Sequence, residues 1–160
     1  MEVQKEVVRL LNFAYRYLSY RMRTEQEIKT YLFKKAEQKH IPSHFIDKTI
    51  DQLKEEGYIN DTVYIQEFIH SRSSSKPKSE FVLSMELRQK GVSKDLIDAY
   101  FEANPLNEEF LAKKALQSKW SRYSAYYSEE RTKKAIQFLL RRGFTYDIIK
   151  KTIEELASEE

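Results

Sequence analysis

The side chains best suited to chemistry are a pair of histidines and four pairs of carboxylates. His40 and His44 are four residues apart, which on a helix would place both on one face as metal ligands. Pro42 lies between them and breaks regular helical spacing, so the sequence favours an ordinary turn over a metal site. Adjacent carboxylates diverge by about 100° on a helix and do not converge on one reacting atom. These pairs are Glu55–Glu56, Glu108–Glu109, Glu129–Glu130 and Glu154–Glu155.

Other residue types that catalysis or cofactor binding requires are missing from the sequence. The 160 residues include no Cys, which excludes disulfides, iron–sulfur clusters and thiol nucleophiles. Gly57, Gly91 and Gly143 are widely separated, whereas Rossmann and Walker phosphate loops need several glycines close together. The sequence therefore predicts a protein that is not an enzyme, with no catalytic residue, no metal, no cofactor and no small-molecule substrate.

Positive charge gathers with aromatic residues toward the C-terminal end. Residues 111–142 carry nine basic and two acidic residues, although the formal net charge of the chain is only +3. Trp120, Tyr123, Tyr126 and Tyr127 are interleaved with these cations, a pattern that suits phosphates and exposed bases. The alternative is that the aromatic side chains pack between helices and the charges are solvated. The nine basic residues are Lys113, Lys114, Lys119, Arg122, Arg131, Lys133, Lys134, Arg141 and Arg142.

A smaller cluster of the same kind lies toward the N-terminal end. Three arginines alternate there with three tyrosines, so both interpretations, nucleic-acid contact and helix packing, apply again. The residues are Arg16, Arg21 and Arg23 with Tyr15, Tyr17 and Tyr20.

The signals for helices recur three times along the chain. Apolar residues at helical spacing, low Gly and Pro content, and a capping box of Thr24 with Glu27 predict helices throughout. Ile46, Ile97 and Ile149 hold the same place in three similar segments, 51 and 52 positions apart. Each unit is predicted to be a long helix, a loop, a second helix, a short turn and a third helix.

The residues that begin and end these helices are also predicted. All three glycines are expected to end helices, Gly57 in a left-handed conformation, and Ser93, Ser128 and Thr145 are expected to cap helices. In the second and third units five positions separate the apolar residues on either side of the short turn. In the first unit Leu32 and Ile41 are nine positions apart, which predicts a longer turn there.

One unit of three short helices buries little apolar surface, whereas stacked neighbours share a core. The sequence therefore predicts an all-α fold of three tandem three-helix repeats, residues 1–60, 61–105 and 106–160, forming an elongated curved solenoid. The apolar stretches are too short to span a membrane, and the N-terminus is unlike a signal peptide. A cytoplasmic location is expected.

Two stretches carry a resemblance to a known family. Residues 21–28 read Arg-Met-Arg-Thr-Glu-Gln-Glu-Ile, and residues 53–61 read Leu-Lys-Glu-Glu-Gly-Tyr-Ile-Asn-Asp. In order and spacing they are similar to the Arg-x-Arg-Ser-Glu-x-Glu-Leu opening and the Leu-x-x-x-Gly-Tyr-Leu-Asp-Asp junction of the RecX family, the regulators of RecA recombinase. Lys76 and His40 depart from that pattern, because each stands where the family has Gly. Further matching positions are Tyr64, Arg72, Pro77, Leu83, Leu87, Lys90, Gly91, Val92 and Ile97.

The resemblance implies three-helix repeats that lie in the groove of the RecA–single-stranded-DNA filament. There they would inhibit ATP hydrolysis and strand exchange and favour disassembly of the filament. In this way they would regulate homologous recombination, DNA repair and the SOS response. The expected partners are the RecA filament and single-stranded DNA, the latter bound weakly or through the filament. The expected contact surface comprises the basic residues of both clusters together with Arg88.

Two alternatives to a RecA inhibitor stay open. The first is a nucleic-acid-binding helical repeat protein that acts through its basic, aromatic third repeat. The second is a helical adaptor unrelated to RecA, which an apolar surface patch would favour.

Overall fold

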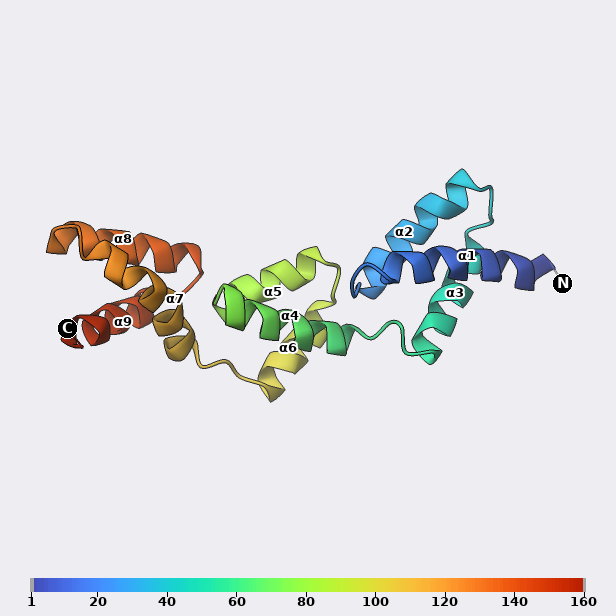
Figure 1. The fold of residues 1–160 in the computed structure, drawn as a ribbon. Helices are drawn as coiled ribbons and strands as arrows, with labels where there is room; N and C mark the ends of the chain where they lie inside the picture. Colours follow the sequence, from blue (N-terminus) through green and yellow to red (C-terminus); the bar gives the residue numbers. More distant parts are fainter. Residues whose placement is uncertain (1, 160) are drawn as a thin grey trace. The chain divides into compact units, whose positions relative to one another are not determined.

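The computed structural model describes residues 2–159, and this part of the chain forms nine α-helices and no strand (Figure 1). The predicted all-α fold of three three-helix units in tandem is thereby confirmed. None of the helices in this part of the chain is long and apolar enough to cross a membrane. The helices are α1 (Glu2–Leu18), α2 (Glu25–Gln38), α3 (His44–Glu55), α4 (Asp61–Ser75), α5 (Glu80–Gln89), α6 (Lys94–Ala103), α7 (Glu108–Tyr123), α8 (Ser128–Arg141) and α9 (Tyr146–Ser158).

The start of α2 is fixed by the predicted capping box. Thr24 Oγ1 accepts a hydrogen bond from the Glu27 N–H at 3.1 Å, and Glu27 Oε2 accepts one from the Thr24 N–H at 3.1 Å. Both bonds satisfy N–H groups that would lack a partner within the helix. The expected cap at Ser128 is wrong by one residue, because Tyr127 occupies the N-cap of α8 and Ser128 begins the helix.

Three further helices differ in how they are capped. Ser93 Oγ accepts a hydrogen bond from the Leu96 N–H at 3.3 Å, as predicted for α6. Thr145 is the N-cap of α9, but its side chain makes no capping hydrogen bond. Asn107, which the sequence did not single out, caps α7 by accepting a hydrogen bond from the Phe110 N–H at 3.0 Å.

The turn between the second and third helices is closed in the same way in all three repeats. Gly91 and Gly143 have φ values of 85° and 86°, and His40 holds the corresponding place with φ 54°. The longer turn expected in the first repeat is confirmed, but only by one residue, since residues 39–43 connect its helices whereas 90–93 and 142–145 connect those of the other repeats. Counting from Leu32 overstates the difference, because the residue equivalent to Leu87 and Leu139 is Ala36. The closing hydrogen bonds run from Ile41 N–H to Ala36 O (2.8 Å), from Val92 N–H to Leu87 O (3.1 Å) and from Phe144 N–H to Leu139 O (3.3 Å).

The contacts of the chain form two compact units. One comprises residues up to Gln66 together with Leu87–Ile97, and the other comprises Glu67–Glu86 together with residues from Asp98 onward. The boundary between the units therefore runs through the three helices of the second repeat.

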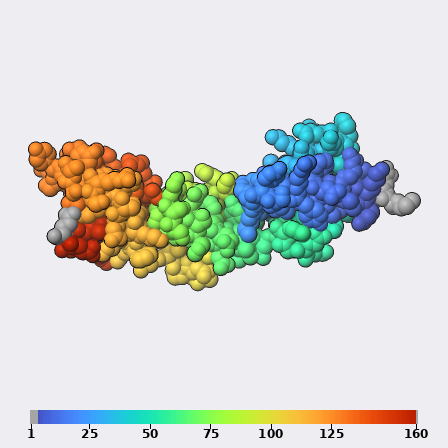
Figure 2. Space-filling view, viewed as in Figure 1, coloured from blue at the N-terminus to red at the C-terminus, as the bar shows by residue number. Residues whose placement is uncertain are grey.

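Each unit has a hydrophobic core of its own. In the first unit α1, α2 and α3 enclose fully buried side chains such as Leu10 and Leu32. In Figure 2 the surface of these helices is coloured blue to blue-green. In the second unit α7, α8 and α9 surround Leu116, Leu139 and Ile149. These apolar faces are the ones that helical spacing predicted.

In the first unit, the start of α2 packs against the turn that follows α5. Thr24 Oγ1 donates a hydrogen bond to the Lys90 carbonyl at 2.6 Å, and the Glu25 N–H donates one to Asp61 Oδ1 at 2.9 Å. A methyl group on Gly91 would lie only 2.4 Å from Cβ of Gln26. The close approach therefore requires glycine, both for space and for the positive φ.

The second unit repeats this junction one repeat later in the chain. The Ser79 N–H, just before α5, donates a hydrogen bond to the Arg142 carbonyl at 3.0 Å, and the Glu80 N–H donates one to Glu108 Oε1 at 2.7 Å. A methyl group on Gly143 would lie 2.3 Å from Cγ2 of Val82. In both junctions a carboxylate and a glycine turn of one repeat meet the second-helix N-terminus of the preceding repeat.

Candidate functional site

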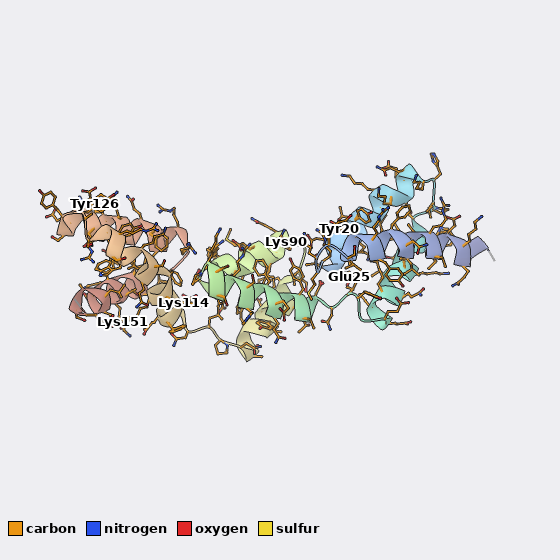
Figure 3. All side chains as sticks on the ribbon, in the orientation of Figure 1. Tyr20, Glu25, Lys90, Lys114, Tyr126 and Lys151 are labelled. Carbon is orange, nitrogen blue, oxygen red and sulfur yellow. The ribbon has the colours of Figure 1, made fainter. Side chains whose placement is uncertain are left out.

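Five of the nine predicted cations of the third repeat make no ion pair within residues 2–159. Four of them are exposed and Lys119 is half-buried. Packing of α7, α8 and α9 around their apolar faces leaves the four exposed side chains in solvent, so they are available to an anionic partner, and Figure 3 labels one of them, Lys114. The other four are Lys114, Arg122, Lys133 and Arg141.

Two other cations of this cluster are neutralised by carboxylates of the same unit. Lys113 Nζ lies 2.6 Å from Glu159 Oε1 and 3.6 Å from Glu155 Oε2, and the hydrogen bond with Glu159 is the main cause that raises the pKa of this lysine. Lys134 Nζ lies 3.7 Å from Glu130 Oε1 and 4.4 Å from the centre of the Tyr126 ring. These two contribute less to a surface for anions.

The remaining two arginines pack against aromatic rings. The guanidinium carbon of Arg131 lies 3.7 Å from the centre of the Trp120 ring, and its Nη2 donates to the Trp120 carbonyl at 3.3 Å. Arg142 donates from Nη1 to the Pro77 carbonyl at 3.2 Å and lies 4.9 Å from the Phe138 ring. Burial, with a smaller effect of neighbouring Arg141, lowers the pKa of Arg142. Both arginines therefore hold the fold together.

Two of the four aromatic side chains of this cluster are occupied by packing, because Trp120 is buried and Tyr123 is half-buried. Tyr126 is 41% exposed, with Lys134 Nζ 4.4 Å from the centre of its ring. Tyr127 is 90% exposed, so its ring is accessible to a base. The packing interpretation therefore applies to Trp120 and Tyr123, and the interpretation as an accessible surface applies to Tyr126 and Tyr127.

The N-terminal cluster is arranged as a column of rings and cations. The ring of Tyr17 stacks on the ring of Tyr31 with centres 4.0 Å apart and planes 8° apart. The guanidinium carbon of Arg23 lies 3.9 Å from the centre of Tyr17, and Lys35 Nζ lies 5.6 Å from the centre of Tyr31. Arg16 is exposed, and so is Arg88 on α5.

Arg21 is held by an acid of the capping box. Its Nη2 lies 2.6 Å from Glu27 Oε1, and its Nη1 donates to the Met22 carbonyl at 2.9 Å. Burial alone would raise the pKa of the Glu27 carboxyl, but the hydrogen bonds from Arg21 and Thr24 and the charges of Arg21 and Lys90 keep that pKa below its usual value. Glu27 thus stays ionised and is matched by Arg21.

Beside this column lies a hollow that the sequence did not reveal. Its volume is about 340 Å³, and it brings two lysines from different repeats, Lys34 and Lys90, to one place. They are far apart in the sequence, so no local pattern connects them, and the glycine turn at Gly91 is the one sequence signal for the close approach. The other lining residues are Tyr17, Gln26, Glu27, Thr30, Tyr31 and Gln89.

The histidines and carboxylate pairs have structural surroundings. His40 is in the turn after α2, and the His44 ring lies 4.0 Å from the Phe45 ring. Residues 2–159 contain no group of three or more potential metal ligands. Glu108 accepts the Glu80 N–H of the junction, and Glu109 Oε2 lies 2.7 Å from Lys151 Nζ.

Comparison with known proteins gives a consistent result along the chain. Models of the first, second and third three-helix domains of RecX match residues 11–53, 60–100 and 108–153 in that order. The regulatory protein RecX of Streptococcus agalactiae serotype V is 34% identical over 149 residues, which are 92% of this chain and 55% of that protein. The regulatory protein RecX of Bacillus cytotoxicus is 31% identical over 99% of this chain and 56% of its own length. The chain thus spans about half the length of the curated relatives it matches.

A solved structure has the same fold over nearly its whole length. The crystal structure of RecX from Lactobacillus salivarius superimposes with a TM-score of 0.78 at 25% sequence identity. The match covers 96% of this chain and 98% of that one.

Proposed function

This chain belongs to the RecX family, and on that premise we propose that it is a non-enzymatic inhibitor of RecA recombinase that binds the RecA–single-stranded-DNA filament. RecA as the partner follows from the family resemblance. The observation that supports a contact surface is the set of third-repeat cations that stay exposed without an ion pair within residues 2–159. Such cations are attracted to a partner that carries DNA phosphates or acidic side chains.

The proposed mechanism needs binding but no chemical step. Three similar helical units offer similar surfaces one after another, which suits a filament made of identical subunits. Binding would stabilise a state of the filament that hydrolyses ATP slowly. The size of this effect would equal the difference between the binding free energies for the slow and the active filament states. Inhibition of strand exchange and of filament growth would follow from the same preference.

A RecA ATPase assay on single-stranded DNA tests this proposal directly. The cognate RecA is held at constant concentration, and this protein is added well below that concentration. We expect inhibition at substoichiometric ratios, because a regulator of filament growth acts on many subunits at once. Absence of inhibition at equimolar protein would refute the function while leaving the fold unaffected.

The contribution of the third repeat is tested by charge reversal. In the triple variant Lys114→Glu, Lys133→Glu and Arg141→Glu, we expect the concentration for half-inhibition of the ATPase to rise at least about tenfold, because attraction becomes repulsion. Arg131 and Arg142 are left intact because they pack against Trp120 and Phe138.

The matched control reverses three exposed first-repeat lysines, Lys5, Lys39 and Lys48, and keeps the same net charge as the triple variant. Inhibition by the control should stay close to that of the original chain. An equal loss in both variants would show that only total charge matters and would remove the site from the third repeat.

A second candidate function is direct binding of nucleic acid by the third repeat. The exposed ring of Tyr127 and the exposed Lys133 of the same repeat favour it, since aromatic rings stack on bases and lysines contact phosphates. Salt separates the two candidates. A direct phosphate binder loses affinity steeply between about 50 and 200 mM salt without RecA present, whereas a regulator of RecA needs RecA for any effect.

A further inference from the structure

The hollow between α1, α2 and the end of α5 has the composition of an anion site. Lys34 on α2 and Lys90 after α5 both line it, and neither makes an ion pair within residues 2–159. The Gln26 and Gln89 amides and the Thr30 hydroxyl are further lining groups that can donate hydrogen bonds. In Figure 3 Lys90 and Tyr20 are labelled at this end of the first unit.

The single acid of the hollow does not cancel this charge. Glu27 is the only acidic lining residue, and its carboxylate is already engaged by Arg21 at 2.6 Å and by the Thr24 N–H at 3.1 Å. Arg21 supplies the main counter-charge of Glu27 and Lys90 a smaller part of it, so the three cations Arg21, Lys34 and Lys90 outnumber the one carboxylate. The hollow therefore attracts anions.

The rings beside the hollow do not offer their faces to a base. Tyr17 carries Arg23 on one side and Tyr31 on the other, and Lys35 Nζ lies 5.6 Å from the centre of the Tyr31 ring. The faces of Tyr17 are thus occupied, and a cation lies close to Tyr31. Recognition at this place consequently relies on charge and hydrogen bonds, without stacking of bases.

The number of cations distinguishes between a single carboxylate and a charged polymer. Arg23 and Lys35 at the two ends of the ring column extend the positive charge beyond Lys34 and Lys90 in the hollow. One carboxylate cannot neutralise all four, whereas the successive phosphates of a nucleic-acid strand can. A strand backbone is the ligand that fits this distribution best.

We propose that this hollow binds a phosphate of the backbone of single-stranded nucleic acid through Lys34 and Lys90. The site differs from the third-repeat cations and does not depend on RecA, so it stands or falls independently of the proposed inhibition. The strand crosses the ring column with its bases directed away, and binding does not depend on base sequence.

The test is a fluorescence-anisotropy titration of a labelled thymidine oligonucleotide without RecA. The double variant Lys34→Gln and Lys90→Gln should bind several-fold more weakly. The slope of log K against log salt should become shallower by about 0.7, which corresponds to the loss of the one phosphate contact that the two lysines make. The matched control, Lys5→Gln with Lys48→Gln, has the same net charge, and both residues are exposed on the first repeat outside the hollow. It should retain the original affinity and slope.

An abasic oligonucleotide of equal length provides the second measurement. We expect the lysine pair to matter equally for abasic and for normal strands, because the hollow contacts the backbone alone. The proposal is overturned if the hollow variant and the control variant lose affinity equally. It is also overturned if the lysine pair matters only for strands with bases, or if an acidic peptide binds the hollow more tightly than the abasic strand does.

Discussion

At the scale of residues, Gly57 and Gly91 share a left-handed backbone but differ in their surroundings. A methyl group on Gly57 (φ 79°) would have nothing within 4 Å, whereas one on Gly91 (φ 85°) would meet Cβ of Gln26 at 2.4 Å. The sequence indicates that both glycines end helices. It does not indicate that one of them is also a contact between repeats.

This difference predicts unequal effects of alanine. Gly57→Ala should lower the free energy of unfolding by about 1 kcal/mol, from backbone strain alone. Gly91→Ala should cost a further ~1–3 kcal/mol, because the methyl group overpacks the junction. Urea denaturation of the two variants measures both values. Equal effects of the two substitutions would show that the junction accommodates the extra methyl group with no loss in the free energy of unfolding.

The hydroxyl of Tyr15 gives a second prediction at this scale. It donates a hydrogen bond of 2.5 Å to Glu56 Oε2, and this bond, with burial and the Glu56 charge, raises the pKa of Tyr15 to about 12. Because the folded pKa is raised, the bond's contribution to stability is present below pH 10 and is lost as pH rises toward 12. A difference absorbance titration of the original chain against Tyr15→Phe should show a tyrosine with this high pKa. If the tyrosine seen in that difference had an ordinary pKa, the hydrogen bond between Tyr15 and Glu56 would be refuted.

At the scale of elements, helix starts are specified locally and then reused between repeats. Thr24 is the clearest case, because it caps α2 and also donates to the Lys90 carbonyl at 2.6 Å. Ser93 caps α6 by a single bond of 3.3 Å and is exposed. The same N-cap pattern is therefore expected to contribute different amounts to the stability of the fold at these two positions.

Alanine at the two caps should reveal that difference. Thr24→Ala removes the cap and leaves a buried carbonyl without its donor, so we expect a loss of about 2 kcal/mol in the free energy of unfolding. Ser93→Ala should cost about 0.5 kcal/mol. Thr24→Ser, which keeps the hydroxyl, is the control and should recover most of the loss. Thermal unfolding followed by circular dichroism makes the comparison, and similar losses for both alanines would argue against a junction role of Thr24.

At the scale of the whole molecule, the elongated, curved solenoid stays a prediction of the sequence. A compact domain of this length has a radius of gyration of about 15 Å. Stacking of three repeats side by side predicts a clearly larger value. Small-angle X-ray scattering of the monomer measures it, and a value near that of a compact domain would refute the solenoid.

The sequence by itself determined the helices, their capping box and the three glycines at helix ends, and it indicated the family. Each of these depends on residues within one or two turns of each other, such as Thr24 with Glu27, so local physics decides them. One local expectation failed, the cap at Ser128, because Tyr127 occupies the N-cap position and Ser128 begins the helix.

The tertiary structure alone decided which charges are available. Nine cations look alike in the sequence, yet Arg131 and Arg142 pack on rings while Lys133 and Arg141 stay in solvent. The hollow with Lys34 and Lys90 exists because the junction at Gly91 joins residues that are distant along the chain. Exposure and proximity of this kind depend on packing between helices, which no local spacing encodes.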